Sequence, residues 1–151
     1  MEELRKEEEV VILFAAQKKN LKEDDAWESL DELEELVNTA GARAAVKVLQ
    51  RVDSINPGYY IGTGKVEELK ELVALHGATG VVSDDELSPV QMRNLSLELG
   101  VKVMDRTLVI LDIFAQRARS REGKLQALFE QISKDIVVAM KAKDKVALEA
   151  L

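Results

Sequence analysis

The sequence predicts an α/β protein, in which a mainly parallel sheet of about four strands with flanking helices is followed by a long helical C-terminal segment. Two observations predict this class. Short apolar segments rich in β-branched residues alternate with longer segments whose apolar residues recur every three to four positions. Glycine or a turn sequence separates most of these segments. We therefore expect an α/β domain over residues 1–105 and helices over residues 106–151.

The start of the chain is expected to hold two strands with a helix between them. Val10–Ala16 is short, begins with β-branched residues and is flanked by charges, as a buried strand would be. Ser29 and Glu32 have the spacing of a capping box, and apolar residues then recur at helical spacing up to Gly41. Ala42–Arg51 alternates in residue type, which predicts a second strand.

The middle of the chain predicts a turn, a helix and a third strand. Asn56-Pro57-Gly58 is a turn sequence. Thr63–His76 carries apolar residues on one helical face, and Gly77 is placed to end that helix. His76 is best interpreted as a residue of the last helical turn and not as a catalytic base. Val81-Val82 is expected to form a short buried strand.

A third helix and a fourth strand complete the predicted sheet domain. Ser88 is the expected N-cap, because Pro89 suits the first helical position and Gln91 can complete a capping box. Gly100 ends this helix, and Val101–Met104 is the fourth strand.

From Arg106 to Leu151 the sequence predicts helices, with an interruption near Ser120–Gly123. Leu108–Phe114 is ambiguous, because its β-branched residues would also suit a strand.

Composition excludes several classes of site. The sequence has no cysteine and one histidine, which excludes disulfides, thiol nucleophiles and a conventional zinc centre. No apolar stretch approaches the ~20 residues that span a bilayer, and the acidic N-terminus lacks the apolar centre of a signal peptide. We therefore expect a cytoplasmic protein without a membrane partner, a metal or a cofactor.

Charge is distributed unevenly along the chain. The net charge is −7, but residues 1–105 hold 12 basic and 22 acidic side chains, whereas residues 106–145 hold 9 basic and 5 acidic ones. The densest basic stretch contains Arg117, Arg119, Arg121 and Lys124, three of which share a helical face by their spacing. Arginine suits bidentate phosphate contacts, so these are candidate RNA-binding residues. A solvated helix face is the alternative.

Gly58–Val66 resembles a phosphate-binding loop only superficially. A Walker A motif needs glycine where Tyr59 stands, and serine or threonine where Val66 follows Lys65. We interpret the segment as a tight turn into a helix. Weak anion binding at that helix N-terminus stays open, with Gly62, Gly64 and Lys65 as candidates.

Asp84, Asp85 and Glu86 follow a predicted strand, where open α/β sheets place ligands. They could hold magnesium through carboxylate oxygens. We prefer the interpretation that they precede a helix and interact with its dipole, because no basic partner is evident in the sequence.

Four segments together resemble the N-terminal domain of the HflX family: Tyr60–Leu69 (YIGTGKVEEL), Asp84–Pro89 (DDELSP), Val103–Thr107 (VMDRT) and Ile110–Gln126 (ILDIFAQRARSREGKLQ). HflX proteins are translational GTPases that bind the large ribosomal subunit and split ribosomes. The resemblance therefore implies contact with that subunit and its rRNA. The sequence has no Walker A, DxxG or NKxD motif, so we expect no GTPase activity and no catalytic residue. Some family N-terminal regions are linked to ATP, which keeps open weak ATP binding or hydrolysis through Lys65, Asp84 and Asp85.

The sequence departs from the HflX pattern after Gln126. Residues 128–151 resemble the first helix of the GatB/YqeY family, which suggests a hybrid chain. A structural or engineered fusion with no activity of its own is therefore an alternative function. Leu128–Ala150 has one apolar stripe at helical spacing, so we also expect copies of the chain to associate through this helix.

Overall fold

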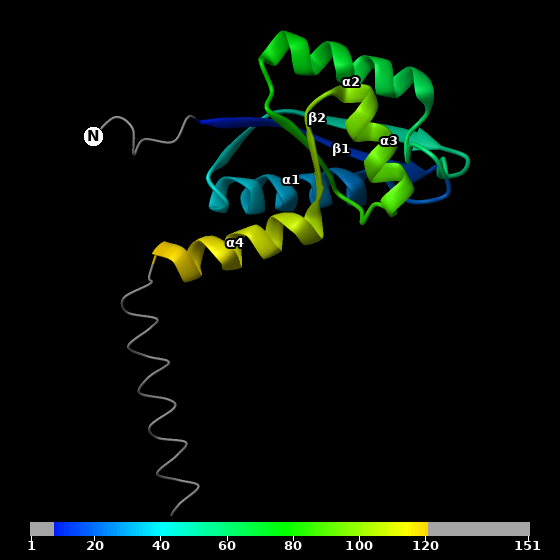
Figure 1. The fold of residues 1–151 in the computed structure, drawn as a ribbon. Helices are drawn as coiled ribbons and strands as arrows, with labels where there is room; N and C mark the ends of the chain where they lie inside the picture. The colour runs from blue at the N-terminus through cyan, green and yellow to red at the C-terminus, as the bar shows by residue number, and fades with distance from the viewer. Residues whose placement is uncertain (1–7, 121–151) are drawn as a thin grey trace, which may run out of the picture. The chain divides into compact units, whose positions relative to one another are not determined.

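The structure is a computed structural model that describes residues 8–120 of the chain. Its four strands form one parallel sheet in the order β2-β1-β3-β4 (Figure 1). The elements follow one another as β1 (Glu9–Lys18), α1 (Glu23–Thr39), β2 (Ala42–Val52), α2 (Thr63–His76), β3 (Gly80–Ser83), α3 (Pro89–Leu99), β4 (Lys102–Asp105) and α4 (Arg106–Ser120). The predicted fold class, with four parallel strands and flanking helices, is confirmed. The ambiguous segment Leu108–Phe114 is helical, as part of α4.

The chain divides into two units, Met1–Ile113 and Phe114–Leu151. The sheet, its covering helices and the beginning of α4 belong to the first unit. Of the second unit, the structure describes only the end of α4. The expected interruption of the helix near Ser120–Gly123 and the helix expected over 128–151 lie outside the described residues. Within residues 8–120 no helix is both long and apolar enough to cross a membrane.

Strand β1 is buried on both faces, which explains its continuous apolar sequence. One set of alternate residues, which includes Phe14, packs in a core with Leu69 of α2 and Leu95 of α3. The other set, which includes Leu13, packs in a second core with α1 and with Val109 of α4. Helices α2 and α3 therefore cover one face of the sheet, and α1 with the start of α4 covers the other (Figure 1).

The order of the strands places a crevice at the carboxyl ends of the two central strands, β1 and β3. The chain passes from β1 to the neighbouring β2 through α1, then returns across β1 to β3 through α2 on the opposite face. The direction of winding thus reverses between β1 and β3. In open parallel sheets, ligands bind outside the carboxyl ends of the strands at such a reversal.

The ends of α3 follow the sequence prediction. Ser88 Oγ accepts a hydrogen bond from the Gln91 backbone N–H at 3.1 Å, and Gln91 Oε1 accepts one from the Ser88 backbone N–H at 2.9 Å. Gly100 and, at the end of α2, Gly77 adopt the left-handed conformation. This conformation costs glycine little, because it has no Cβ.

The predicted start of α1 is wrong. The helix begins at Glu23, so Ser29 lies inside it and caps nothing. Its N-cap, Lys22, makes no side-chain capping hydrogen bond, and the first turn carries Glu23, Asp24 and Asp25 instead. Carboxylates in the first turn interact favourably with the positive end of the helix dipole. The helix can therefore start without a capping side chain.

Candidate functional site

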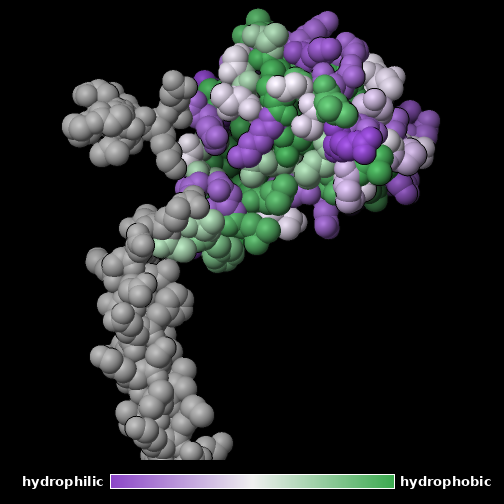
Figure 2. Space-filling view, in the orientation of Figure 1, coloured by the Kyte–Doolittle hydropathy of each residue, from purple (hydrophilic) through white to green (hydrophobic). Residues whose placement is uncertain are grey.

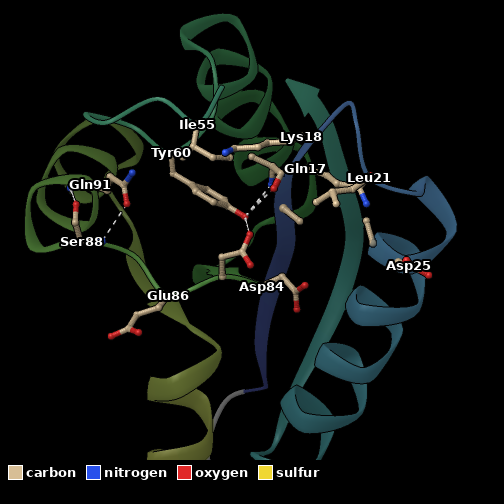
Figure 3. A pocket seen from close by; sticks show the side chains of 14 residues that line it. Gln17, Lys18, Leu21, Asp25, Ile55, Tyr60, Asp84, Glu86, Ser88 and Gln91 are labelled. Carbon is tan, nitrogen blue, oxygen red and sulfur yellow. Dashed lines mark hydrogen bonds between the residues drawn. The ribbon is translucent and has the colours of Figure 1, made fainter. Parts of the chain in front are cut away.

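A cavity of about 730 Å³ lies at the carboxyl ends of β1 and β3, in the crevice described above (Figure 3). Its lining comes from the end of β1, the segment after β3, the N-terminal part of α1, the start of α3 and the loop after β2. Its apolar lining consists of Ala15, Ala16, Leu21, Ala26 and Ile55 with the ring of Tyr60. The volume is in the range of small-molecule sites, about 300–1,000 Å³.

Tyr60 is part of the lining of this cavity (Figure 3). Asn56 Oδ1 accepts hydrogen bonds from the N–H groups of Gly58 at 2.8 Å and Tyr59 at 2.9 Å, which folds the loop back on itself. Tyr60 then takes a positive φ of 68°, and its ring packs edge-on against Phe14 with the ring centres 5.8 Å apart. The loop conformation thus turns an aromatic side chain into the core, where it is 3% exposed.

The phenol of Tyr60 connects two strand ends. Its oxygen accepts a hydrogen bond from the Ala16 backbone N–H at 2.8 Å, and its proton is donated to the carboxylate of Asp85. Burial, and then the negative charge of Asp85, raise the pKa of Tyr60 well above its ordinary value. Tyr60 therefore remains a neutral donor to Asp85.

Gln17 is a buried polar residue in the wall of the cavity, only 8% exposed. Its Nε2 donates to the Lys22 carbonyl oxygen at 2.6 Å. This contact fixes the orientation of the amide, because a flipped amide would place two oxygen atoms against each other. Within residues 8–120, Gln17 Oε1 is buried without a hydrogen-bond partner. An acceptor of this kind needs a donor from a ligand or from water.

The charged lining of the cavity is mostly acidic. It contains four carboxylates, from Asp25, Asp84, Asp85 and Glu86, and one ammonium group, from Lys18. Asp84 has a basic partner, contrary to the interpretation from the sequence. Arg106 Nη2 lies 2.6 Å from Asp84 Oδ1, and the same nitrogen contacts the Ser29 carbonyl oxygen at 2.7 Å. This pair was not found because Arg106 is 22 residues away in the sequence.

Asp105 stabilises the same edge of the sheet from the end of β4. It is 4% exposed, and its two oxygens accept hydrogen bonds from the backbone N–H groups of Leu87 at 3.1 Å and Leu108 at 3.0 Å. The carboxylate thus caps α4 and holds the loop that leads to α3. Among residues 8–120, no group of three or more histidines and carboxylates is arranged to hold a metal ion.

The structure separates the nucleotide-binding candidates. Asp84 and Asp85 line the cavity, whereas Gly62, Gly64 and Lys65 lie at the start of α2 and are not part of its lining. The Gly62 N–H donates to Gln50 Oε1 at 2.7 Å. Lys65 Nζ pairs with Glu68 Oε2 at 2.7 Å in the same helix. The glycine-rich segment is therefore a turn at the start of α2, and its polar groups contact Gln50 and Glu68.

The RNA-binding candidates fall at the edge of the described residues. Arg117 is an exposed residue of α4, and Arg119 lies two positions further along the same helix. Arg121 and Lys124 lie outside the described residues.

Sequence reasoning missed Tyr60, Gln17 and Arg106 at this edge. Gln17 carries a signal that could have identified it, a polar residue at the carboxyl end of an apolar strand. Arg106 directly follows β4, but its contact with Asp84 joins residues 22 positions apart. Tyr60 carries no such signal, because it reaches the cavity from the loop after β2.

Comparison with known proteins identifies relatives of this chain. Residues 27–115, more than half of it, match the family described as GTP-binding GTPase N-terminal. A GTPase HflX of Lacrimispora saccharolytica is 57% identical over 130 residues, which cover 86% of this chain and 30% of the relative. One of Caldanaerobacter subterraneus is 48% identical over 132 residues, 87% of this chain and 30% of the relative. The chain thus spans about a third of the length of these relatives.

A solved structure agrees with these relatives. A crystal structure of a variant of SsGBP matches with a TM-score of 0.57 and 26% identity, over 78% of this chain and 36% of that one. The family match covers most of α1 and all of β2, α2, β3, α3 and β4. The chain therefore belongs to the GTP-binding GTPase N-terminal family, to which its resemblance to HflX proteins had pointed.

Proposed function

We propose that this chain is the RNA-contacting N-terminal region of an HflX-type GTPase, that it binds rRNA of the large ribosomal subunit weakly, and that it does not hydrolyse GTP. Family membership supports the proposal, together with relatives that are named GTPase HflX. The sequence lacks the Walker A, DxxG and NKxD motifs of GTPases. Phosphate contacts by a few basic side chains would give weak, salt-sensitive binding.

The observation that carries this proposal is the change of charge along the chain. Residues 1–105 hold 22 acidic and 12 basic side chains, and an RNA backbone is repelled by such a surface. The balance reverses after Arg106, and the dense basic stretch begins with exposed Arg117 on α4. A polyanion is therefore expected to approach the chain at the stretch from Arg117 to Lys124.

Sedimentation with purified large ribosomal subunits at low salt tests this proposal. A triple variant with Arg117, Arg121 and Lys124 replaced by glutamate should lose binding, because each substitution replaces a cation by an anion; its melting temperature is measured in parallel to show that it stays folded. The matched control replaces Lys70, Arg93 and Lys102 by glutamate, which changes the net charge by the same amount at three exposed positions. Binding that survives in the first variant, or disappears equally in both, would contradict the proposal. A chain that never binds would favour the alternative of a fusion without its own activity.

Association between copies is a second candidate function, and the exposed apolar residues of α4 favour it. Leu108 is 37% exposed, Ile110 36% and Leu111 56%. Figure 2 shows hydrophobic residues gathered over α4. The helix first expected to mediate association, Leu128–Ala150, lies outside the described residues. Light scattering at micromolar concentration should report a dimer that Leu111→Glu shifts to monomer. A monomer in the unmodified chain would contradict this candidate.

A further inference from the structure

We propose that the cavity at the carboxyl ends of β1 and β3 binds a small organic cation, whose ammonium or guanidinium group donates hydrogen bonds to Asp85 and to Gln17 Oε1. This binding activity is separate from RNA contact by the basic stretch, and it uses none of the same residues. The inference rests on the unpartnered acceptor, the charge of the lining and the shape of the cavity.

The unpartnered oxygen of Gln17 defines what the ligand must supply. Gln17 Oε1 is buried among residues 8–120 without a partner, while Nε2 is held by the Lys22 carbonyl at 2.6 Å. The amide therefore presents an acceptor and cannot rotate to present a donor without losing that contact. A buried acceptor without a hydrogen bond costs free energy, so a ligand that supplies an N–H donor to it gains binding free energy.

Asp85 supplies a charged acceptor in the same cavity. The buried phenol of Tyr60 donates to Asp85 Oδ2, which holds the carboxylate in place and leaves Oδ1 for a ligand. A carboxylate positioned by a rigid neighbour loses little side-chain entropy when it binds a cation. Asp85 and Gln17 therefore offer two acceptors, one charged and one neutral, to a group that carries several N–H donors.

The charge of the lining selects a cation over a phosphate. Of its four carboxylates, Asp84 is neutralised by Arg106 at 2.6 Å, and the lining holds one ammonium group, from Lys18, against the other three. The start of α3, where an anion could otherwise bind free N–H groups, is closed by the capping box of Ser88 and Gln91. A nucleoside triphosphate would bring its negative charge into this acidic lining, so ATP is disfavoured here.

The shape of the cavity suits a short aliphatic chain. Ala16, Leu21 and Ile55 belong to the apolar part of the cavity wall. Burial of methylene groups on such a wall adds affinity in proportion to the area covered. A four-carbon chain with a cationic group at each end can contact the wall while one end reaches Asp85.

Isothermal titration of the full chain with agmatine tests the proposal, because agmatine carries a guanidinium group, a four-carbon chain and an ammonium group. We expect saturable binding of one molecule per chain, and no binding of 1,4-butanediol, which has the same chain without charge. Asp85→Asn and Gln17→Leu should each weaken binding about tenfold or more, since each removes one acceptor. Glu71→Gln is the matched control for Asp85→Asn, because it removes one charge from an exposed position outside the lining and should leave binding unchanged.

Two further variants keep the test decisive if Asp85→Asn disturbs Tyr60. Asp25→Asn and Glu86→Gln change exposed lining residues, and each should weaken agmatine binding more than Glu71→Gln does. Equal weakening by all of these variants would mean attraction to an acidic surface only, and would overturn the proposal. It would also be overturned by the absence of saturable binding, or by ATP binding more tightly than agmatine. None of these outcomes depends on binding to ribosomes.

Discussion

At the scale of single residues, Tyr60 joins three segments of the chain beside the cavity. Its phenol is the partner of the buried Ala16 N–H and the donor to Asp85, so one side chain joins the loop after β2 to β1 and to the segment after β3. Residues 44 and 25 positions apart in the sequence meet at this oxygen. No local pattern in the sequence marks such a contact, and the cavity could not be predicted for that reason.

Tyr60→Phe should lower the free energy of unfolding by about 1–3 kcal/mol, because it leaves the Ala16 N–H buried without a partner. The unmodified protein should also lose stability above pH ~10, where the phenol ionises in the unfolded chain but stays protonated in the folded one, with a slope of at most about 1.4 kcal/mol per pH unit. The variant should lack this contribution. Urea unfolding between pH 7 and pH 11 measures both effects.

Tyr59→Phe is the control for this prediction, because Tyr59 is only half-buried. It should change the stability by less than Tyr60→Phe at pH 7 and should keep the alkaline slope that Tyr60 supplies. Equal effects of the two substitutions would contradict the role assigned to the Tyr60 phenol.

Arg106 forms a second contact that sequence reasoning missed, with Asp84 after β3. Its guanidinium contacts Asp84, whose side chain is 9% exposed, and Ser29 inside α1. Arg106→Ala should lower the free energy of unfolding by about 3 kcal/mol, because it leaves a mostly buried carboxylate without its partner. Asp84→Asn in the same chain should recover part of that loss, since the uncompensated charge is then gone. Thermal unfolding of the four combinations measures the coupling, and strictly additive losses would contradict it.

At the scale of elements, periodicity predicted most of the fold. The alternation of short β-branched segments with segments of helical periodicity predicted each strand and helix of the sheet domain. Strand β1, for example, is buried on both faces and therefore has a continuous apolar sequence. The N-cap of α1 is Lys22 and not Ser29, seven residues earlier than predicted, since a carboxylate-rich first turn replaces the side-chain cap that defines most helix starts. Ser29 and Glu32 have the spacing of a cap, yet Ser29 serves as a contact for Arg106.

Helix α3 offers a test of the capping interaction that the sequence predicted correctly. Ser88→Ala should lower the free energy of unfolding by about 1 kcal/mol, because the Gln91 N–H loses its acceptor. Ser96→Ala, at an exposed position in the interior of the same helix, makes the same chemical change away from the cap. It should be neutral or slightly stabilising, since alanine favours helices. Chemical denaturation compares the two variants, and equal losses would show that the capping box contributes nothing particular.

At the scale of the whole molecule, acidic and basic side chains are distributed unevenly along the chain. Residues 1–105 have an excess of acidic side chains, and four of their carboxylates line the cavity, whereas the excess of basic side chains begins in the sequence of α4. If both proposals hold, we expect a small cation to bind in the cavity and RNA to bind at the basic stretch. Composition predicted this separation, because charges can be counted along a sequence. It could not predict which carboxylates share a cavity, because that depends on how the strands are ordered.

Salt dependence should distinguish the two partners in one protein. RNA binding by three or four basic side chains releases counterions, so the logarithm of the binding constant should fall with the logarithm of salt concentration with a slope of about −2 to −4. The triple glutamate variant of Arg117, Arg121 and Lys124 should abolish this binding, and the control at Lys70, Arg93 and Lys102 should keep most of the slope. Fluorescence anisotropy with an rRNA fragment between 50 and 200 mM salt measures it. A slope near zero would mean that the basic stretch does not neutralise phosphates, and RNA binding would then need another explanation.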